Sequence, residues 1–231
     1  MGNKSSRKEQ VAEMFDSISG RYDLLNHVLS LGVDRWWRRS MVQRAKRCRP
    51  QSVLDVATGT GDSAIALKKS GAVRIVGVDI SAQMLKVAKA KPNAAGIEFV
   101  EADGEQLPFE DCCFDVVTIA FGIRNFEQRR RGLQEMRRVL KQSGTLIVLE
   151  LSMPANRILR GIYKLYFLKA VPLLGKLISH NGYAYRYLPR SVDEFPSRKA
   201  FADEVREAGF EKVKAAALSG GLATIYEARK K

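Results

Sequence analysis

The stretch Ser52-Val-Leu-Asp-Val-Ala-Thr-Gly-Thr-Gly-Asp62 decides the fold of this chain. Residues 53–56 form an apolar run with the length of a buried strand, and residues 64–67 return to a helical apolar spacing. Between them, Gly59 and Gly61 allow the backbone to turn sharply and to come close to a ligand. The stretch therefore predicts a strand, a tight turn and a helix, with a ligand site at the turn.

Acidic residues stand at the ends of three successive predicted strands. Asp55 lies at the end of the first strand, Asp79 ends the strand at 73–79, and Asp103 follows the strand that begins at Ile97. In nucleotide-binding folds, an acid about 20 residues after the glycine turn accepts hydrogen bonds from ribose hydroxyls. An acid after the third strand suits an adenine amine. Together the three acids resemble the S-adenosylmethionine site of class I methyltransferases.

This resemblance implies a fold and a cofactor. The fold is α/β and Rossmann-like, with a seven-stranded, mostly parallel sheet and helices on both faces. The fourth and fifth strands are expected at 114–121 and 144–151, and a final pair, one strand of it antiparallel, at 210–218 and 222–228. The cofactor is S-adenosyl-L-methionine, converted to S-adenosyl-L-homocysteine. The implied cofactor-binding residues are Asp55, Thr58, Gly59, Thr60, Gly61, Asp79, Ile80, Asp103, Gly104 and Ala120.

The length and the net charge of the chain limit its domain number and the kinds of partner that it can have. A chain of 231 residues suits one α/β domain with additions. Its net charge of +14 indicates contact with nucleic acid, a phospholipid surface or an acidic small molecule, without choosing among them. Charged residues near both ends, such as those at 4–8, are expected to be solvated.

The three cysteines have neither metal-ligand nor disulfide spacing, so we expect no metal site and a reducing, cytoplasmic compartment. No secretory signal or transmembrane helix is expected.

The first 50 residues are predicted to form a helical cap. Apolar spacing indicates helices at 8–18, 22–31 and 35–47, the last with Asp34 as its N-cap. Because they precede the first strand, these helices can pack over the carboxyl ends of the strands, where ligands bind. The alternative is that they only complete the core. Residues 51–231 then form the methyltransferase core, including a lid at 153–190.

Several segments resemble signatures of the ubiquinone/menaquinone biosynthesis C-methyltransferases. They lie at 15–26, 29–32, 35–39, 121–125, 138–152 and 185–188 and together span most of the chain. The chain departs from that family at Asp34, where members commonly carry His, and at Ala120, where Ser is frequent. The resemblance implies C-methylation of a polyprenylated demethylquinol, either demethylmenaquinol or the benzoquinol of the ubiquinone pathway.

Such a reaction needs an electron-rich ring carbon, which a phenolate provides. Phenols have a pKa of about 10, so a base, or a cation that stabilises the phenolate, would help the reaction. The candidate groups are Asp34, His27, His180, Tyr185, Arg124 and Arg186. Of these, Arg124 and Arg186 are preferred as orienting cations with Tyr185 nearby, and for both histidines a role without proton transfer is favoured.

The apolar segment at 153–178 admits two interpretations. It forms a lid or wall for a polyprenyl tail, with its lysines near phospholipid headgroups at the membrane periphery, or it forms two helices that pack on the sheet edge.

Other functions stay open at this point: methylation of another lipophilic small molecule, methylation of nucleic acid, or cofactor binding without catalysis. Nucleic acid is disfavoured as a substrate for two reasons. The fourth strand lacks the Asn-Pro-Pro-Tyr-type motif with which nucleic-acid amine methyltransferases orient the amine. Cytosine C5 methyltransferases use a nucleophilic cysteine, but Cys112 and Cys113 precede the fourth strand and so lie on the wrong side. A homodimer is one option for the oligomeric state.

Overall fold

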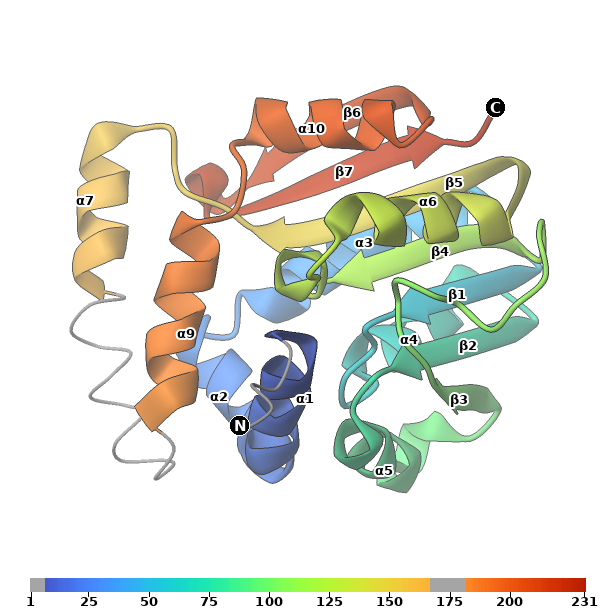
Figure 1. Ribbon diagram of the computed structural model, residues 1–231, viewed down its shortest axis with the longest axis horizontal. Helices are drawn as coiled ribbons and strands as arrows, with labels where there is room; N and C mark the ends of the chain where they lie inside the picture. The colour runs from blue at the N-terminus through green and yellow to red at the C-terminus, as the bar shows by residue number, and fades with distance from the viewer. Residues whose placement is uncertain (1–6, 167–181) are drawn as a thin grey trace, which may run out of the picture.

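A seven-stranded sheet forms the centre of the molecule (Figure 1). The computed structural model describes residues 7–166 and 182–231, without the side chains of residues 7, 164 and 182–186. The strand order is β3-β2-β1-β4-β5-β7-β6, and β7 runs in the direction opposite to the other six strands. The strands are β1 Ser52–Val56, β2 Arg74–Asp79, β3 Ile97–Glu101, β4 Phe114–Ala120, β5 Leu140–Leu151, β6 Glu211–Leu218 and β7 Ala223–Arg229. The predicted fold class is therefore confirmed.

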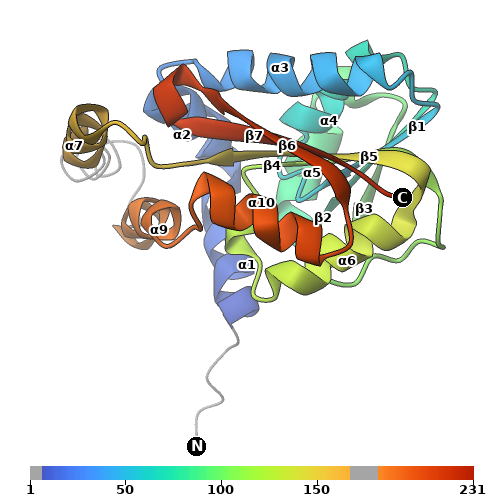
Figure 2. The same ribbon diagram turned by 90° about the horizontal axis from the view of Figure 1, so that it is seen from above.

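Helices cover both faces of the sheet, because every residue of β1 is buried and both of its faces need apolar partners. Val53 packs with helices α3 (Asp34–Arg47) and α4 (Asp62–Leu67) on one face. Leu54 packs on the other face with the helices α6 and α10 (Figure 2). These two helices span Arg129–Val139 and Arg198–Glu207, and α5 (Ala82–Ala90) lies beside β3.

Four further helices gather at the carboxyl ends of the parallel strands, where the arrows of β4 and β5 point (Figure 1). They are α1 Arg7–Ile18, α2 Tyr22–Leu29, α7 Arg157–Leu165 and α9 Gly182–Asp193. The first two belong to the predicted cap, and the last two to the predicted lid. Residues 167–181, which include His180 and much of the apolar segment, lie outside the described residues. Among the helices that are described, none is long and apolar enough to cross a membrane.

Three predicted boundaries were wrong. The predicted N-cap Asp34 is the first residue of α3 with Val33 before it, and its carboxylate binds other side chains instead of the helix end. Helix α2 ends at Leu29 because Leu31 and Gly32 adopt left-handed backbone angles, with φ of 53° and 76°. Strand β5 begins at Leu140 rather than four residues later, because Leu140 pairs with the start of β4.

Candidate active site

The turn between β1 and α4 forms the floor of a first cavity. Gly59 and Gly61 have positive φ angles of 57° and 80°, as their position in a tight turn requires. The main-chain N–H of Gly59 donates to Asp79 Oδ2 over 2.7 Å, and the N–H of Ser81 donates to Asp79 Oδ1 over 2.9 Å. Two backbone donors therefore fix the Asp79 carboxylate at the mouth of β2.

Asp55 supports this turn from behind. Its buried carboxylate accepts hydrogen bonds from Thr58 Oγ1 and Thr118 Oγ1, each 2.7 Å long. Burial raises the pKa of Asp55 to about 6, and the two hydroxyl donors only partly offset this. Asp55 thus links β1 to its own turn and to β4.

The first cavity, here called the nucleoside cavity, brings together most of the predicted cofactor residues. Its predicted lining residues are Gly59, Asp79, Ile80, Asp103, Gly104 and Ala120. The remaining predicted residues, Asp55, Thr58, Thr60 and Gly61, shape the turn without lining the cavity. Sequence reasoning missed the lining residues Lys8, Phe15, Tyr22, Glu105 and Phe126. Two of these, Phe15 and Tyr22, pack edge to face at 5.8 Å between ring centroids.

Gly104 lies in the wall of this cavity at a point where packing leaves no room for a side chain. A Cβ at this position would lie 2.5 Å from Cζ of Phe126 and 2.9 Å from Cγ1 of Val56. The apolar side chains Ile80 and Phe126 and the carboxylates of Asp79 and Asp103 line the same cavity. An apolar cavity with two carboxylate acceptors fits a flat base with an attached ribose, so the lining is suited to S-adenosyl-L-methionine.

Lys8 closes the outer end of the nucleoside cavity. Its ammonium group forms ion pairs with Asp103 and, over 3.0 Å, with Glu105 Oε2. The expectation that the charged residues at 4–8 are solvated is therefore wrong for Lys8, which belongs to α1. No pattern in the sequence indicated this contact, because the ion pair to Asp103 joins positions 95 residues apart.

A second cavity of about 360 Å³, here called the apolar cavity, adjoins the first. Tyr22 and Phe121 line both cavities. The apolar lining comes from α2, α3, the end of β5, α7, α9 and the turn before β7, and it includes Leu29, Trp37, Leu151, Tyr163, Tyr166, Leu188 and Leu222. Its charged lining residues are Asp34, Arg38 and Arg124. This size and composition are typical of sites for lipophilic small molecules.

Arg124 is the buried cation of the apolar cavity. Its guanidinium Nη1 donates to Glu150 Oε1 over 2.7 Å, and the Glu150 side chain is fully buried. The Nε of Arg124 is buried without a hydrogen-bond partner among the described residues. Burial lowers the pKa of Arg124, but the Glu150 carboxylate more than offsets this, so the pKa lies above its ordinary value. Arg124 therefore keeps its positive charge, and its Nε–H has no acceptor among the described residues.

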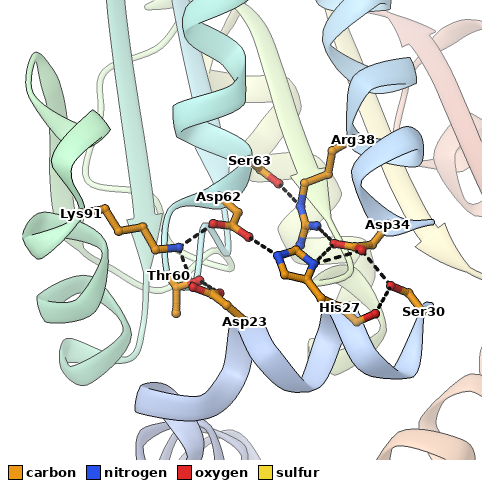
Figure 3. A network of polar contacts seen from close by, with 9 residues as sticks. All are labelled: Asp23, His27, Ser30, Asp34, Arg38, Thr60, Asp62, Ser63 and Lys91. Atoms are coloured by element: carbon orange, nitrogen blue, oxygen red, sulfur yellow. Dashed lines mark hydrogen bonds and ion pairs between the residues drawn. The ribbon is translucent and has the colours of Figure 1, made fainter. Parts of the chain in front are cut away.

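Asp34 is the acid of the apolar cavity and anchors a polar network (Figure 3). It accepts hydrogen bonds from Ser30 Oγ over 2.7 Å and from Arg38, and it lies 2.9 Å from Nδ1 of His27. Burial alone would raise the pKa of Asp34, but the Ser30 hydroxyl and the Arg38 charge hold it below its ordinary value. Asp34 is thus ionised at neutral pH.

The same network ties the cap to the glycine turn. Nε2 of His27 lies 4.0 Å from Oδ2 of Asp62, and Lys91 bridges Asp62 and Asp23 (Figure 3). Asp23 in turn accepts a hydrogen bond from Thr60. The predicted cofactor residue Thr60 therefore holds α2 against the turn.

The predicted residues Tyr185 and Arg186 lie on α9, but their side chains are outside the described residues. Their neighbour Tyr187 donates to Asn125 Oδ1 over 3.1 Å, which joins α9 to the segment that carries Arg124. Tyr163 of α7 and Tyr166, the C-cap of that helix, line the apolar cavity, and the Tyr166 hydroxyl donates to the Leu29 carbonyl over 3.0 Å. Both tyrosines were missed from the sequence, where only the apolar character of their segment was recognised.

Comparison with known proteins gives the chain clear relatives. The model of the ubiE/COQ5 methyltransferase family matches residues 3–230. The ubiquinone/menaquinone biosynthesis C-methyltransferase UbiE of Geotalea uraniireducens (strain Rf4) is 45% identical over 232 residues, which cover 98% of each chain. The demethylmenaquinone methyltransferase of Deinococcus radiodurans is 47% identical over 229 residues, covering 98% of this chain and 95% of the relative.

Solved structures with little sequence identity share the fold. A SAM-dependent methyltransferase of Thermotoga maritima is 22% identical, with a TM-score of 0.64 over 95% of this chain and 99% of its own. One of Aquifex aeolicus is 18% identical, with a TM-score of 0.58 over 78% of this chain and 82% of its own. At this level of identity, the similarities show the fold alone.

Proposed function

Since the chain belongs to the ubiE/COQ5 methyltransferase family and is therefore an S-adenosyl-L-methionine-dependent C-methyltransferase, we propose that its substrate is a polyprenylated demethylquinol. Demethylmenaquinol is the principal candidate, and S-adenosyl-L-homocysteine is the other product. The observation that carries this proposal is the meeting of the nucleoside cavity and the apolar cavity at Tyr22 and Phe121. A methyl donor and a lipophilic acceptor bound in these cavities would face each other there.

The bound cofactor supplies an electrophilic methyl group, and the protein prepares the ring that receives it. Arg124 carries the main part of this task, because its free Nε–H points to no protein acceptor among the described residues. A quinol oxygen placed against this N–H loses its proton more readily, since the guanidinium charge stabilises the phenolate. The negative charge then raises the electron density of the neighbouring ring carbon.

Asp34 accepts the hydrogen bond of the quinol hydroxyl before its proton leaves. It lines the same cavity as Arg124 and carries its charge at neutral pH. Nδ1 of His27 lies 2.9 Å from this carboxylate and holds it in place. The activated ring carbon would accept the methyl group that the cofactor supplies, with S-adenosyl-L-homocysteine as the leaving group. The proton on that ring carbon would then pass to water, which restores the aromatic ring.

The proposal is tested with the purified full chain, S-adenosyl-L-methionine and demethylmenaquinol carrying a short prenyl tail. We expect a quinol one methyl group heavier by mass spectrometry, in equal yield with S-adenosyl-L-homocysteine. The matched control is Asp79→Ala, which removes the fixed carboxylate of the nucleoside cavity and should abolish both products. Methyl transfer to RNA, with none to any quinol, would contradict the proposal.

The benzoquinol of the ubiquinone pathway is the second candidate substrate. One relative is named for both ubiquinone and menaquinone synthesis, and an apolar cavity of about 360 Å³ does not by itself choose between the two rings. Competition between the two quinols at equal concentration separates them, because the ratio of their kcat/KM values measures the preference directly.

A further inference from the structure

Helix α7 exposes an unusual number of apolar side chains. Ile158, Ile162 and Leu165 are 75%, 61% and 55% exposed, and their spacing places them along one side of the helix. Leu159 on the same helix is 44% exposed, and Leu31 after α2 is 80% exposed. These five residues are here called the apolar rim. Figures 1 and 2 both show α7 at one extreme of the molecule.

The apolar rim continues from the lining of the apolar cavity to the surface. Leu31, Leu159 and Ile162 line that cavity and are also exposed to solvent. A cavity meant for a ligand dissolved in water needs no apolar edge, since exposed apolar surface of this kind is unfavourable there. An apolar edge is favourable when the cavity opens into an apolar phase.

A basic groove lies beside α7. It is lined by Arg160 of α7 and by Arg198, Lys199 and Arg206 of α10, with Asp193 as the only acid among its described lining residues. These four cations are here called the basic groove. The Nε of Arg198 is buried and has no hydrogen-bond partner in the described part of the chain. The groove is therefore prepared for a negatively charged group.

We propose that α7 docks this protein onto the surface of an anionic phospholipid bilayer, with the apolar rim among the acyl chains and the basic groove on headgroup phosphates. Amphipathic helices bind bilayers in this way when apolar area and basic charge act together. The charge of the chain, +14, complements an anionic surface. Resting on the proposed function, the arrangement lets a prenyl tail pass from the bilayer into the apolar cavity without crossing water.

Cosedimentation of the full chain with vesicles tests this docking. We expect the wild-type chain to partition at least about tenfold more strongly onto vesicles of phosphatidylcholine with phosphatidylglycerol than onto phosphatidylcholine alone. The rim variant Ile158→Ser/Leu165→Ser should lose about tenfold in partition onto the anionic vesicles. The groove variant Lys199→Glu/Arg206→Glu should lose about tenfold or more. None of these four residues lines the apolar cavity.

Two matched variants control for surface chemistry in general. Val73→Ser removes an exposed apolar side chain, and Lys69→Glu reverses an exposed charge, both before β2 and so near the amino ends of the parallel strands. Both should keep wild-type partition. Equal partition of the rim or groove variants and the wild type would overturn the proposal. So would a loss of self-association in the rim variant with unchanged vesicle binding, because the face would then be an interface between copies.

A quinol without a prenyl tail separates docking from catalysis. The rim variant should methylate this quinol in solution at the wild-type rate, and lose turnover only on a long-tailed quinol embedded in vesicles. If vesicle binding depends on the rim while no quinol is methylated by any form of the chain, the docking stands and the proposed substrate is wrong.

Discussion

The nucleoside cavity and the apolar cavity share a wall but are built in opposite ways. The nucleoside cavity takes most of its lining from residues 57–127, at the ends of β1 to β4, with α1 as a cover. The apolar cavity draws on helices and turns between positions 22 and 222. The nucleoside cavity offers a polar ligand a backbone turn and carboxylates that are close in sequence. The apolar cavity offers a lipophilic ligand mainly a complementary shape, which segments distant in sequence form together.

The two cavities also differ in how the surrounding protein accommodates a buried charged group. Among the described residues, the hydrogen-bond partners of the Asp55 side chain are two hydroxyl groups, and burial raises its pKa to about 6. Arg124, in the apolar cavity, has the carboxylate of Glu150 at 2.7 Å and keeps its charge. The first arrangement lets the carboxyl group that braces the turn take up a proton near pH 6. The second keeps a guanidinium group charged inside an apolar cavity.

The largest effect is expected at the ion pair of the apolar cavity. Arg124→Ala should lower kcat by about 100-fold or more, because the phenolate loses its cation, while cofactor affinity stays unchanged. It should also lower the free energy of unfolding by about 3–5 kcal/mol, because Glu150 is left buried and unpaired. Steady-state kinetics, calorimetric titration with the cofactor and urea unfolding measure the three quantities.

The double variant Arg124→Ala/Glu150→Ala separates the two roles of this arginine. It removes both buried charges, so it should recover most of the stability and none of the turnover. Recovery of turnover together with stability would mean that Arg124 acts only on the fold.

The second effect concerns the buried carboxyl group of Asp55 and its dependence on pH. Because the folded pKa of Asp55 is raised from 3.8 to about 6, the folded chain binds this proton more tightly than the unfolded chain does. The stability that this proton gives is present below about pH 4 and is lost as pH rises through 6. Asp55→Asn should therefore match wild type near pH 4 and exceed it by up to about 3 kcal/mol at pH 8.

Urea unfolding at pH 4, 6 and 8 measures this difference, and Asp115→Asn is the control of opposite sign. Partial burial would raise the pKa of Asp115, but donors from Lys141 and Ser52 hold it below its ordinary value. The deficit of the Asp115 variant should stay constant from pH 4 to pH 8, because the lowered pKa of Asp115 lies below that range. A constant offset between the Asp55 variant and wild type at every pH would contradict the assigned pKa.

The third effect tests the independence of the two cavities. Gly104→Ala should weaken S-adenosyl-L-homocysteine binding by about tenfold or more, because the new methyl group displaces Phe126 into the nucleoside cavity. The KM for the quinol should stay within about twofold. Gly161→Ala on α7, where a Cβ has open space, is the matched control and should leave binding unchanged. An equal loss at both sites would show that the cavities are coupled.

The smallest effect is expected at the cover of the nucleoside cavity. Lys8 holds Asp103 in an ion pair that is about a third exposed, and such pairs contribute about 0–1 kcal/mol. Lys8→Ala frees the acceptor and should tighten cofactor binding by no more than about fivefold. Lys8→Arg keeps the charge and should leave binding unchanged. A tenfold weaker affinity in Lys8→Ala would instead mean that this lysine contacts the bound cofactor.

The sequence predicted the sheet and the gathering of Gly59, Asp79 and Asp103 at one edge of it, because both depend on patterns within short segments. Gly59, Asp79 and Asp103 follow directly from strand ends, and parallel strands bring their carboxyl ends to one edge. Lys8 and Glu150 were not assigned roles, because their partners are remote in sequence or become buried only after packing. Asp34 was placed at a helix end, but in the structure its carboxylate binds a histidine, a serine and an arginine.

By itself, the sequence determined the order of strands and turns and the acids at their ends, since strand and turn preferences are local. Only the tertiary structure decided which side chains meet in the apolar cavity, which cation keeps a free donor and which face of α7 stays uncovered. These features depend on packing between α2, α3, α7 and α9, and periodicity within one segment carries no information about its neighbours in space.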